Sequence, residues 1–505
     1  MSILEIIVFL PILAALAIGF GAPARFTALG AAGINLICGL VAAGTAKFTD
    51  IEVGGFSFVH ESSRPLLDDP ELALAFGLDG ISLVLLILTV IVTLAAVWVS
   101  PAEIKIKGST KLYYTSSLLI SAGALGAFLS TDLFFLYAFH ELALIPTFLM
   151  IGVFGFGENR KRTAWTITIY LGVGSLILLA GLIALFLNLG GNTFDLATLY
   201  ETASNDVNIP AETQSWIYLL LLVGFGILVS LFPFHSWAPD AYADAPTPIA
   251  MLHSGVLKKF GIYGLIRIAT PMLPAGAEKW ANLVLVLLLG NIIILGLATI
   301  AQKRLDRMLG YSSVMHMGYV FLGVVAGTTI GMSGAVLLMF AHGVSIALLF
   351  ALAGSLRDRF GSLEFEKLGS GLGKTVPKLG LLFGFAAFAS IGLPGFANFA
   401  SEVMVFFGAF QPMEKGDSLG FLQWAAIISL WGVVISAVYM LRAYRNIFKG
   451  PLASPEPRAA DLTWGERIPV LLLIVALMLI GFVPEILLKY LRPALESLTL
   501  IGGGG

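Results

Sequence analysis

Long apolar stretches follow one another along nearly the whole chain and are separated by short polar or charged segments. A bilayer core of ~30 Å needs about 20 helical residues, so stretches of this length predict membrane-spanning helices. The expected ranges, fourteen in number, are 3–21, 26–45, 79–100, 112–129, 133–153, 164–189, 216–235, 248–270, 283–301, 309–327, 333–355, 379–408, 422–441 and 468–488. The pattern therefore predicts an all-α polytopic membrane protein.

Two of these predicted helices are broken. The prolines within and after the seventh are Pro233, Pro239, Pro246 and Pro248. Proline cannot continue a regular helix, so the backbone must change course there. The twelfth is longer than a membrane requires, and Gly392, Pro394 and Gly395 interrupt it about midway. Discontinuous helices at corresponding places in two halves indicate inverted repeats with an ion route between them.

Basic residues gather in alternate connections between the predicted helices, and this bias indicates the cytoplasmic side. The basic residues of these connections are Lys105, Lys107, Lys111, Arg160, Lys161, Arg162, Lys303, Arg304, Arg307, Arg357, Arg359, Lys367, Lys374, Lys378, Arg442, Arg445 and Lys449. The connections 50–71 and 195–212 are acidic or neutral. We therefore predict a multi-pass protein of a prokaryotic inner membrane with both termini on the non-cytoplasmic side. The first apolar stretch lacks a basic segment and a cleavage site, which predicts a retained helix.

Composition excludes several classes of protein. Of the 505 residues, 58% are hydrophobic and 12% are charged, which is not the composition of a soluble domain. A net charge of -2 without a basic patch gives no reason to expect nucleic acid. The single cysteine, Cys38, excludes an intrachain disulfide framework and a cysteine-built iron–sulfur or zinc site. The GLGKT at 371–375 lacks the rest of a phosphate-binding loop. We expect neither a metal nor a redox cofactor in this chain.

Ionisable residues inside the predicted helices are the main functional candidates: Glu141, Lys258, Lys259 and Glu402. A charge at the bilayer centre costs ~3 kcal/mol even on lenient scales, so it normally faces the bundle interior or a wet cavity and marks an ion path. The alternative is a structural carboxylate or a lysine that snorkels to the interface. Adjacent residues point about 100° apart on a helix. One lysine is therefore expected to face the interior and the other a partner or the interface.

Five of the six histidines fall in or beside predicted helices: His140, His235, His253, His316 and His342. Their spacing does not fit a zinc site. A single histidine on an apolar helix is as often a satisfied core residue as a functional one. Five together favour proton transfer, because histidine exchanges protons near physiological pH. Proton movement inside the membrane is the resulting hypothesis.

Five segments together resemble the antiporter-like proton-pumping subunits of respiratory complex I, the NADH-quinone oxidoreductase. They are FPFHSWAPDAYADAPTP (232–248), LHSGVLKKFGIYGLIR (252–267), GYSSVMHMGYV (310–320), AHGVSIALLF (341–350) and IGLPGFANFASEVMVFFG (391–408). Within that group the chain is most similar to the subunit M type, the counterpart of the mitochondrial ND4 chain. The resemblance extends over about residues 75–450.

This resemblance implies about fourteen transmembrane helices with two inverted five-helix repeats. The expected organisation is an N-terminal three-helix segment at 1–111, the repeats at 112–270 and 283–441, and a C-terminal loop and last helix at 442–505. It also implies that NADH, FMN, iron–sulfur clusters and quinone act in partner subunits, which include neighbouring antiporter-like subunits. The lipid bilayer is the remaining partner.

The resemblance also assigns roles to single residues. Glu141 matches the fifth-helix glutamate of the ion pair that couples neighbouring subunits, and Lys259, rather than Lys258, matches the eighth-helix lysine. Glu402 matches the twelfth-helix acid that connects to the exit side, and this acid favours subunit M over its paralogues. The expected proton path is Glu141, Lys259, His316, His342 and Glu402, with Lys258, His235, His253 and His140 as secondary members.

One position departs from the family pattern. A lysine normally lies seven residues before the histidine that is His235 here, and this chain has Leu228 instead. The first half therefore lacks the usual cation for Glu141. One alternative that stays open is that the chain is a structural spacer that does not pump protons. Two other classes share the fold: an Mrp-type cation/proton antiporter subunit and the equivalent subunit of a membrane-bound hydrogenase.

Overall fold

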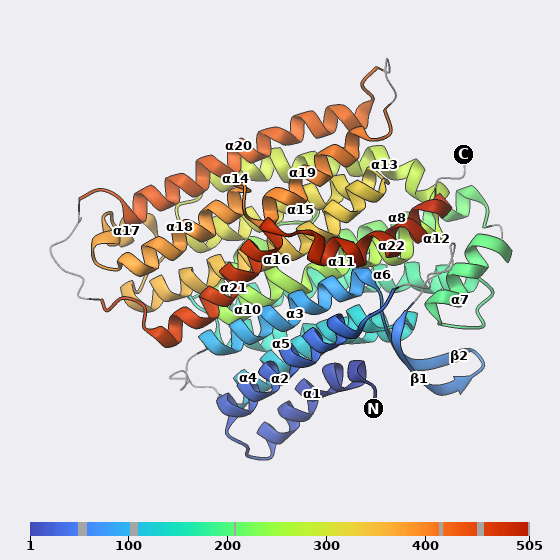
Figure 1. Ribbon diagram of the computed structural model, residues 1–505, viewed down its shortest axis with the longest axis horizontal. Helices are drawn as coiled ribbons and strands as arrows, with labels where there is room; N and C mark the ends of the chain where they lie inside the picture. Colours follow the sequence, from blue (N-terminus) through green and yellow to red (C-terminus); the bar gives the residue numbers. More distant parts are fainter. Residues whose placement is uncertain (49–57, 101–109, 207–208, 414–417, 452–458, 503–505) are drawn as a thin grey trace.

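The computed structural model describes residues 1–48, 58–100, 110–206, 209–413, 418–451 and 459–502. Most of its helices run along the long axis of the molecule, side by side (Figure 1). Both termini lie toward the same end of that axis. Lys105 and Lys107, on which part of the predicted orientation rests, lie outside the described residues.

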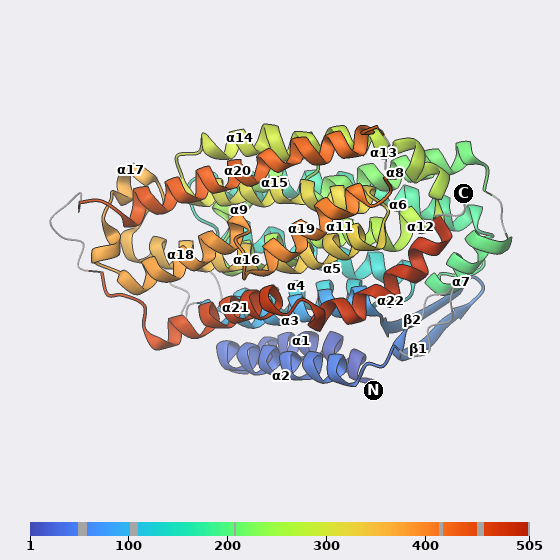
Figure 2. The same cartoon turned by 45° about the horizontal axis from the view of Figure 1, so that its top comes forward.

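The N-terminal part begins with α1 (Ile3–Gly19) and α2 (Ala24–Thr45), which lie together along one side of the bundle (Figure 2). A hairpin follows, formed by β1 (Val59–Asp68) and β2 (Glu71–Leu78), with Val59 opposite Leu78 and Asp68 opposite Glu71. The sequence pattern predicts only a connection over 50–71, and no strand. Helix α3 (Gly80–Val99) then enters the bundle, capped by the Asp79 side chain, which accepts a hydrogen bond from Ser82 N.

Most of the next helices overlap the ranges expected for the fourth to eighth spans, whereas the short helices α7 and α9 lie in predicted connections. They are α4 (Thr110–Leu129), α5 (Leu133–Phe154), α6 (Arg160–Asn188), α7 (Leu196–Glu201), α8 (Ala211–Val229), α9 (Trp237–Asp244), α10 (Thr247–Leu252), α11 (Lys259–Gly264) and α12 (Thr270–Met272). Wider π-helical turns at His253–Leu257 and Leu265–Ala269 join α10, α11 and α12. The predicted regular helix 248–270 is therefore a continuous but uneven helix.

The remaining helices overlap the later predicted ranges, except α17 and α22, which the sequence pattern did not predict: α17 is a single short turn in a connection, and α22 carries charged residues that hide it from an apolar-stretch rule. They are α13 (Pro274–Leu289), α14 (Leu295–Ile300), α15 (Leu305–Val325), α16 (Thr329–Phe360), α17 (Phe365–Leu368), α18 (Pro377–Ile391), α19 (Ala397–Phe410), α20 (Phe421–Phe448), α21 (Trp464–Phe482) and α22 (Glu485–Gly502). Between α18 and α19 the backbone breaks at residues 392–396, where the sequence predicted an interruption. Among the described residues, 11 helical segments are long and apolar enough to cross a membrane, and Ile3–Gly19, Pro377–Ile391 and Ala397–Phe410 are shorter apolar helices.

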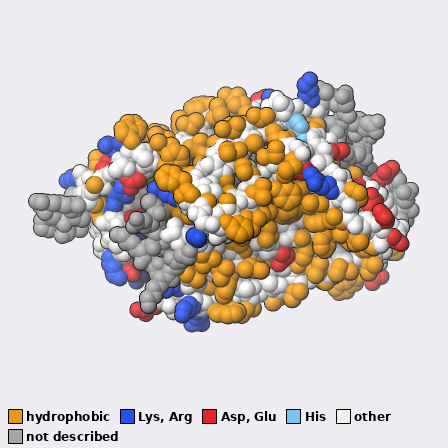
Figure 3. Space-filling model, turned by 90° about the horizontal axis from the view of Figure 1, so that it is seen from below, with side chains coloured by type: hydrophobic (Ala, Val, Ile, Leu, Met, Phe, Trp, Pro, Cys, Tyr) orange, Lys and Arg blue, Asp and Glu red, His pale blue; other side chains and the backbone are white. Residues whose placement is uncertain are grey.

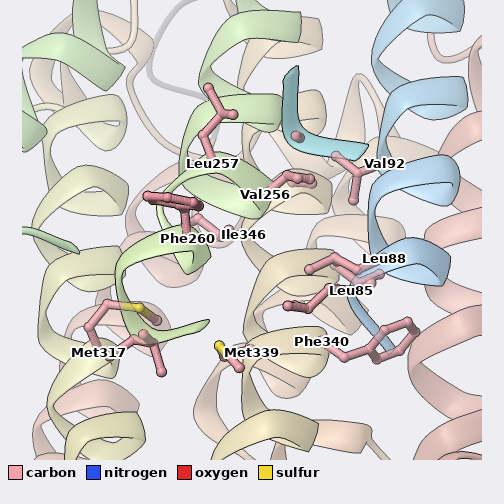
Figure 4. Close-up of a cluster of buried hydrophobic side chains, with 14 of the residues drawn as sticks. Leu85, Leu88, Val92, Val256, Leu257, Phe260, Met317, Met339, Phe340 and Ile346 are labelled. Carbon is pink, nitrogen blue, oxygen red and sulfur yellow. The ribbon is translucent and has the colours of Figure 1, made fainter. Parts of the chain in front are cut away.

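The core of the bundle lies around α16 and α3. In an 18-residue apolar stretch of each helix, 100% of the residues of α16 and 94% of those of α3 are buried. The corresponding share is 33% for α2 and for α21. A helix that is apolar on every side is expected at such a central place, because it has no polar face to turn to water. The outer surface shows a broad band of hydrophobic side chains, with Lys and Arg toward one end and Asp and Glu toward the other (Figure 3). The buried centre is closely packed with aliphatic and aromatic side chains (Figure 4).

Candidate functional site

Both lysines of the doublet are buried at the centre of the bundle. The side chains of Lys258 and Lys259 are 1% and 0% exposed, so the expectation that one faces an interface is wrong. Two features explain this outcome. Lys258 N bonds to His253 O at 3.1 Å across a π-helical turn, which widens the helix just before the doublet. The helix is also surrounded by α3, α4, α8 and α16, which leaves it no outward face.

Lys259 contacts the second half of the chain. Its Nζ donates a hydrogen bond to Ser254 O at 2.7 Å and lies 2.9 Å from Nδ1 of His342 on α16. The ring of His342 is 5.6 Å, centroid to centroid, from the ring of His316 on α15. Three residues that the sequence assigned to one path are therefore brought together in space.

Lys258 lies on the other side of the same helix. Its Nζ is 3.4 Å from Ser313 Oγ on α15 and 5.5 Å from the centre of the Tyr242 ring. No carboxylate contacts either lysine within the described part of the chain. Val256, Leu257 and Phe260, which flank the doublet in the sequence, belong to the cluster of buried hydrophobic side chains in Figure 4. A charge here is thus shielded from bulk water.

His316 leads from the lysines toward the helix break. Its Nδ1 lies 2.8 Å from Ser312 O and its Nε2 3.1 Å from Ser390 O, near the end of α18. Carbonyl oxygens only accept, whereas a neutral imidazole has a single N–H. Donating to both carbonyls requires both ring nitrogens to carry hydrogen, so this geometry can hold the imidazolium form.

Glu402 lies against the break itself. Gly392 ends α18 in the left-handed conformation, with φ of 80°, and a Cβ placed there would lie 2.7 Å from Glu402 Oε2. The carboxylate is buried, and its Oε1 has no hydrogen-bond partner among the described residues. The segment that contains Ser390 and Gly392 therefore lies between His316 and Glu402.

Glu141 is on the outside of the bundle. Its side chain is 33% exposed, accepts a hydrogen bond from Ser175 Oγ on α6, and lies 3.4 Å from His140 Nδ1. It lines a cavity of about 310 Å³ between α5 and α6, together with Ile145 and Phe148. The outer face around this cavity is apolar, and Ile145 is 70% exposed there.

The secondary histidines lie in the first half. His140 is buried and its ring stacks on Phe260 at 4.0 Å, next to the lysines along the chain. His253 packs against Trp237 and Tyr242, with ring centroids 5.5 and 5.6 Å away. His235 is half-buried and stacks on Phe232, outside this group.

Leu228 occupies an apolar contact. It is 3% exposed near the end of α8, where the neighbouring Ile227 packs closely against Gly174 of α6. Gly174 precedes Ser175, the hydrogen-bond donor to Glu141. The position at which the family has a lysine is therefore filled by a buried leucine, on a helix that packs against α6.

Sequence analysis missed a buried ion pair. Arg267 Nη2 lies 2.6 Å from Asp79 Oδ1, and both side chains are nearly inaccessible. Arg267 is a charged residue inside the predicted helix 248–270, so the same rule that selected Lys258 would have found it. Within the described ranges, no group of three His, Cys, Asp or Glu side chains is placed to hold a metal ion.

Comparisons with known proteins agree on one family. The family described as "NADH:quinone oxidoreductase/Mrp antiporter, TM" matches residues 130–436. NADH-quinone oxidoreductase subunit M from Rickettsia felis is 33% identical over 435 residues, which is 86% of this chain and 85% of that protein.

Two solved structures have the same fold. One is a chain of respiratory complex I from Thermus thermophilus, determined with bound NADH, with a TM-score of 0.88 and 29% sequence identity. The match covers 99% of this chain and 100% of the Thermus chain. A chain of the Mrp complex from Dietzia sp. DQ12-45-1b has a TM-score of 0.82 with 21% identity and covers 99% of both chains. This chain belongs to the family of membrane-spanning subunits shared by NADH:quinone oxidoreductases and Mrp antiporters.

Proposed function

We propose that this chain is the proton-translocating membrane subunit, of the subunit M type, in an NADH-quinone oxidoreductase of the complex I class. The observation that carries the proposal is a series of titratable groups between the outer face and the broken helix. Its members are Glu141, His140, Lys258, Lys259, His342, His316 and Glu402. The relative at 33% identity carries the name of such a subunit.

Electrostatic coupling moves the proton in this proposal. Two charges ~4 Å apart at an effective dielectric of 20 interact by about 4 kcal/mol. Moving one charge against ~100 mV requires about 2.3 kcal/mol, so one such interaction is large enough to drive a proton across the membrane potential. Lys259 and His342 lie within this range, and a second proton on the pair is therefore strongly disfavoured. A charge change at Glu141, imposed by a neighbouring subunit, starts the sequence, and Glu402 releases the proton.

Redox chemistry is assigned to partner subunits. NADH, FMN, iron–sulfur clusters and quinone are proposed to act there, and this chain contributes only proton-transfer groups. Its partners are the other membrane subunits, including neighbouring antiporter-like ones, and Glu141 faces one of them. The apolar outer face around the Glu141 cavity supports that arrangement.

The proposed topology has fourteen transmembrane helices in a prokaryotic inner membrane. Two inverted repeats, 112–270 and 283–441, follow an N-terminal segment at 1–111 and precede the terminal segment 442–505. The repeats are supported by a shared feature: α8 ends at Ser230 with φ of 63° and α18 ends at Gly392 with φ of 80°. The end rich in Lys and Arg is assigned to the cytoplasm, which puts both termini on the opposite side (Figures 1 and 3).

A reconstituted complex tests this function. The protein that copurifies with a tagged copy of this chain is incorporated into vesicles, and NADH and a short-chain quinone are added. We expect quinone reduction with acidification of the vesicle interior, and loss of that acidification with Lys259→Met. An Mrp-type antiporter, the second candidate favoured by the shared fold, would instead exchange an imposed sodium gradient for protons without NADH or quinone, and this outcome would refute the proposal.

A further inference from the structure

Lys258 carries a buried amino group whose place in the fold calls for an explanation. It is 1% exposed, and its contacts are one distant hydroxyl and the face of Tyr242. Burying an unpaired charge costs several kcal/mol, and an apolar side chain of the same volume would remove that cost. A group that is able to lose its proton avoids the cost only while it is neutral. Lys258 is therefore suited to gain and lose a proton rather than to hold a fixed charge.

Buried polar atoms without partners lie beside it. Tyr242 Oη and His253 Nδ1 make no hydrogen bond within the described residues. Buried polar atoms are normally paired with protein or with ordered water. The Tyr242 ring lies 5.6 Å from His253 and 5.5 Å from the Lys258 ammonium. These atoms mark a polar route through an otherwise apolar core.

His140 connects that route to the outer face. It directly precedes Glu141 on α5, and its Nδ1 lies 3.4 Å from Glu141 Oε1. Glu141 is one-third exposed whereas His140 is 5% exposed, so the pair reaches from the outer face into the bundle. His140 stacks on Phe260, which directly follows the lysine doublet. On the inner side, the Tyr242 ring lies between the His253 ring and the Lys258 side chain, in contact with both. The groups thus continue from Glu141 inward to Lys258 without passing position 228.

We propose that His140, His253 and Lys258 form the proton branch of the first half, with Lys258 supplying the cation that Leu228 does not. This inference rests on the proposed function. A proton leaves the Glu141–His140 pair, moves by way of His253, and converts the neutral Lys258 amine to ammonium. Two adjacent buried ammonium groups repel each other, so Lys259 then transfers its own proton to His342. Each transfer breaks one N–H or O–H bond and forms another, and no electron moves.

The test compares three changes at lysine positions in the intact reconstituted complex. Lys258→Met removes the charge and keeps nearly the same shape. Lys258→Arg keeps a charge that cannot be released in a protein. Lys279→Met is the matched control, because Lys279 is exposed in the first half of α13, where its ammonium lies over the Trp280 ring. Quinone reduction and protons transferred per electron are measured for each.

We expect both Lys258 variants to lose proton transfer and Lys279→Met to retain it. If Lys258→Arg restores wild-type yield, Lys258 is only a structural cation and the inference is overturned. Wild-type yield in Lys258→Met overturns it as well. A different result, in which the wild-type complex reduces quinone but moves no protons, would refute the proposed function. Should Lys258→Met fail to assemble, His140→Phe carries the test, because it keeps the stack on Phe260 and removes the titratable ring: proton loss supports the branch, and unchanged yield overturns it.

Discussion

Lys259 Nζ lies 2.9 Å from Nδ1 of His342, although 83 residues separate the two along the chain. Lys259 belongs to the uneven helix formed by α10, α11 and α12. The contact joins this helix to α16, which is the most deeply buried helix of the bundle. Ser254 O holds the lysine from the other side at 2.7 Å. A proton can thus move between an amine and an imidazole whose positions are both fixed by the fold.

The first prediction concerns this pair. Lys259→Ala should lower quinone-coupled proton uptake by about a hundredfold, the range in which a positioned proton-transfer group acts. Uptake and assembly are measured in vesicles, with Lys279→Ala as the exposed-lysine control. A Lys259→Ala complex that pumps like the control would remove Lys259 from the path.

Glu402 gives a second prediction. Glu402→Gln keeps the shape of the side chain but cannot release a proton, so proton uptake should fall while the complex still assembles. Glu402→Asp should retain more activity, because the carboxylate remains and moves by one methylene. Protons transferred per electron distinguish the variants, and an unchanged ratio in Glu402→Gln would show that the carboxylate is not used.

The third prediction tests the contact between Gly392 and Glu402. Gly392→Ala introduces a Cβ that would lie 2.7 Å from Glu402 Oε2, in a backbone conformation with φ of 80°. The left-handed conformation alone costs an alanine about 1–2 kcal/mol. Gly361→Ala is the matched control, because Gly361 has φ of 73° and no atom lies within 4 Å of its added Cβ.

Proton uptake and thermal stability are measured for both glycine variants. We expect both to lose stability and only Gly392→Ala to lose proton uptake in addition, because only this change displaces the carboxylate. Equal proton uptake in the two variants would show that the break does not position Glu402.

The sequence predicted the helices well because apolar stretches of membrane length are unambiguous, and Pro and Gly marked both breaks. It also identified Lys258, Lys259 and Glu402 as buried ionisable residues, but not the Asp79–Arg267 pair. The environment of Lys258 could not be predicted from the sequence, because a π-helical turn depends on tertiary packing and changes the direction in which each side chain points. The hairpin was missed for a similar reason, since β1 has little apolar alternation and is stabilised by pairing with β2.

Asp132 gives a prediction about pH. Burial, together with the nearby Asp195 carboxylate, raises the pKa of Asp132 to about 6, although three backbone N–H groups donate to it, those of Ala73, Phe134 and Phe135. In the unfolded chain the carboxyl has an ordinary pKa near 3.8. Between these values the folded protein keeps a proton that the unfolded chain releases, so stability falls as the pH rises from about 4 to about 6.

Asp132→Asn should remove this dependence, because the amide has no proton to release and still caps α5. Thermal unfolding of the purified protein in detergent is compared at pH 4 and pH 7. We expect the wild type to lose about 2 kcal/mol more than the variant over this interval. Parallel pH profiles would show that Asp132 titrates normally.

The last prediction addresses Glu141 and Leu228 together. If the first half conducts protons by way of His140, Glu141→Gln should abolish most proton uptake, because Glu141 is then the only carboxylate at the outer end of the branch. We expect this outcome. Wild-type proton yield in Glu141→Gln would mean that the first half has lost its relay, and would leave Lys259, His316, His342 and Glu402 as the working path.

Leu228→Lys separates the two cases further. A new buried ammonium costs several kcal/mol unless a partner is near, so a stable variant implies that Glu141 or water reaches position 228. In that variant, Lys258→Met should become tolerable, since the first half would again contain a cation; continued loss of proton uptake in the double variant would show that Lys258 does something that a lysine at 228 cannot replace.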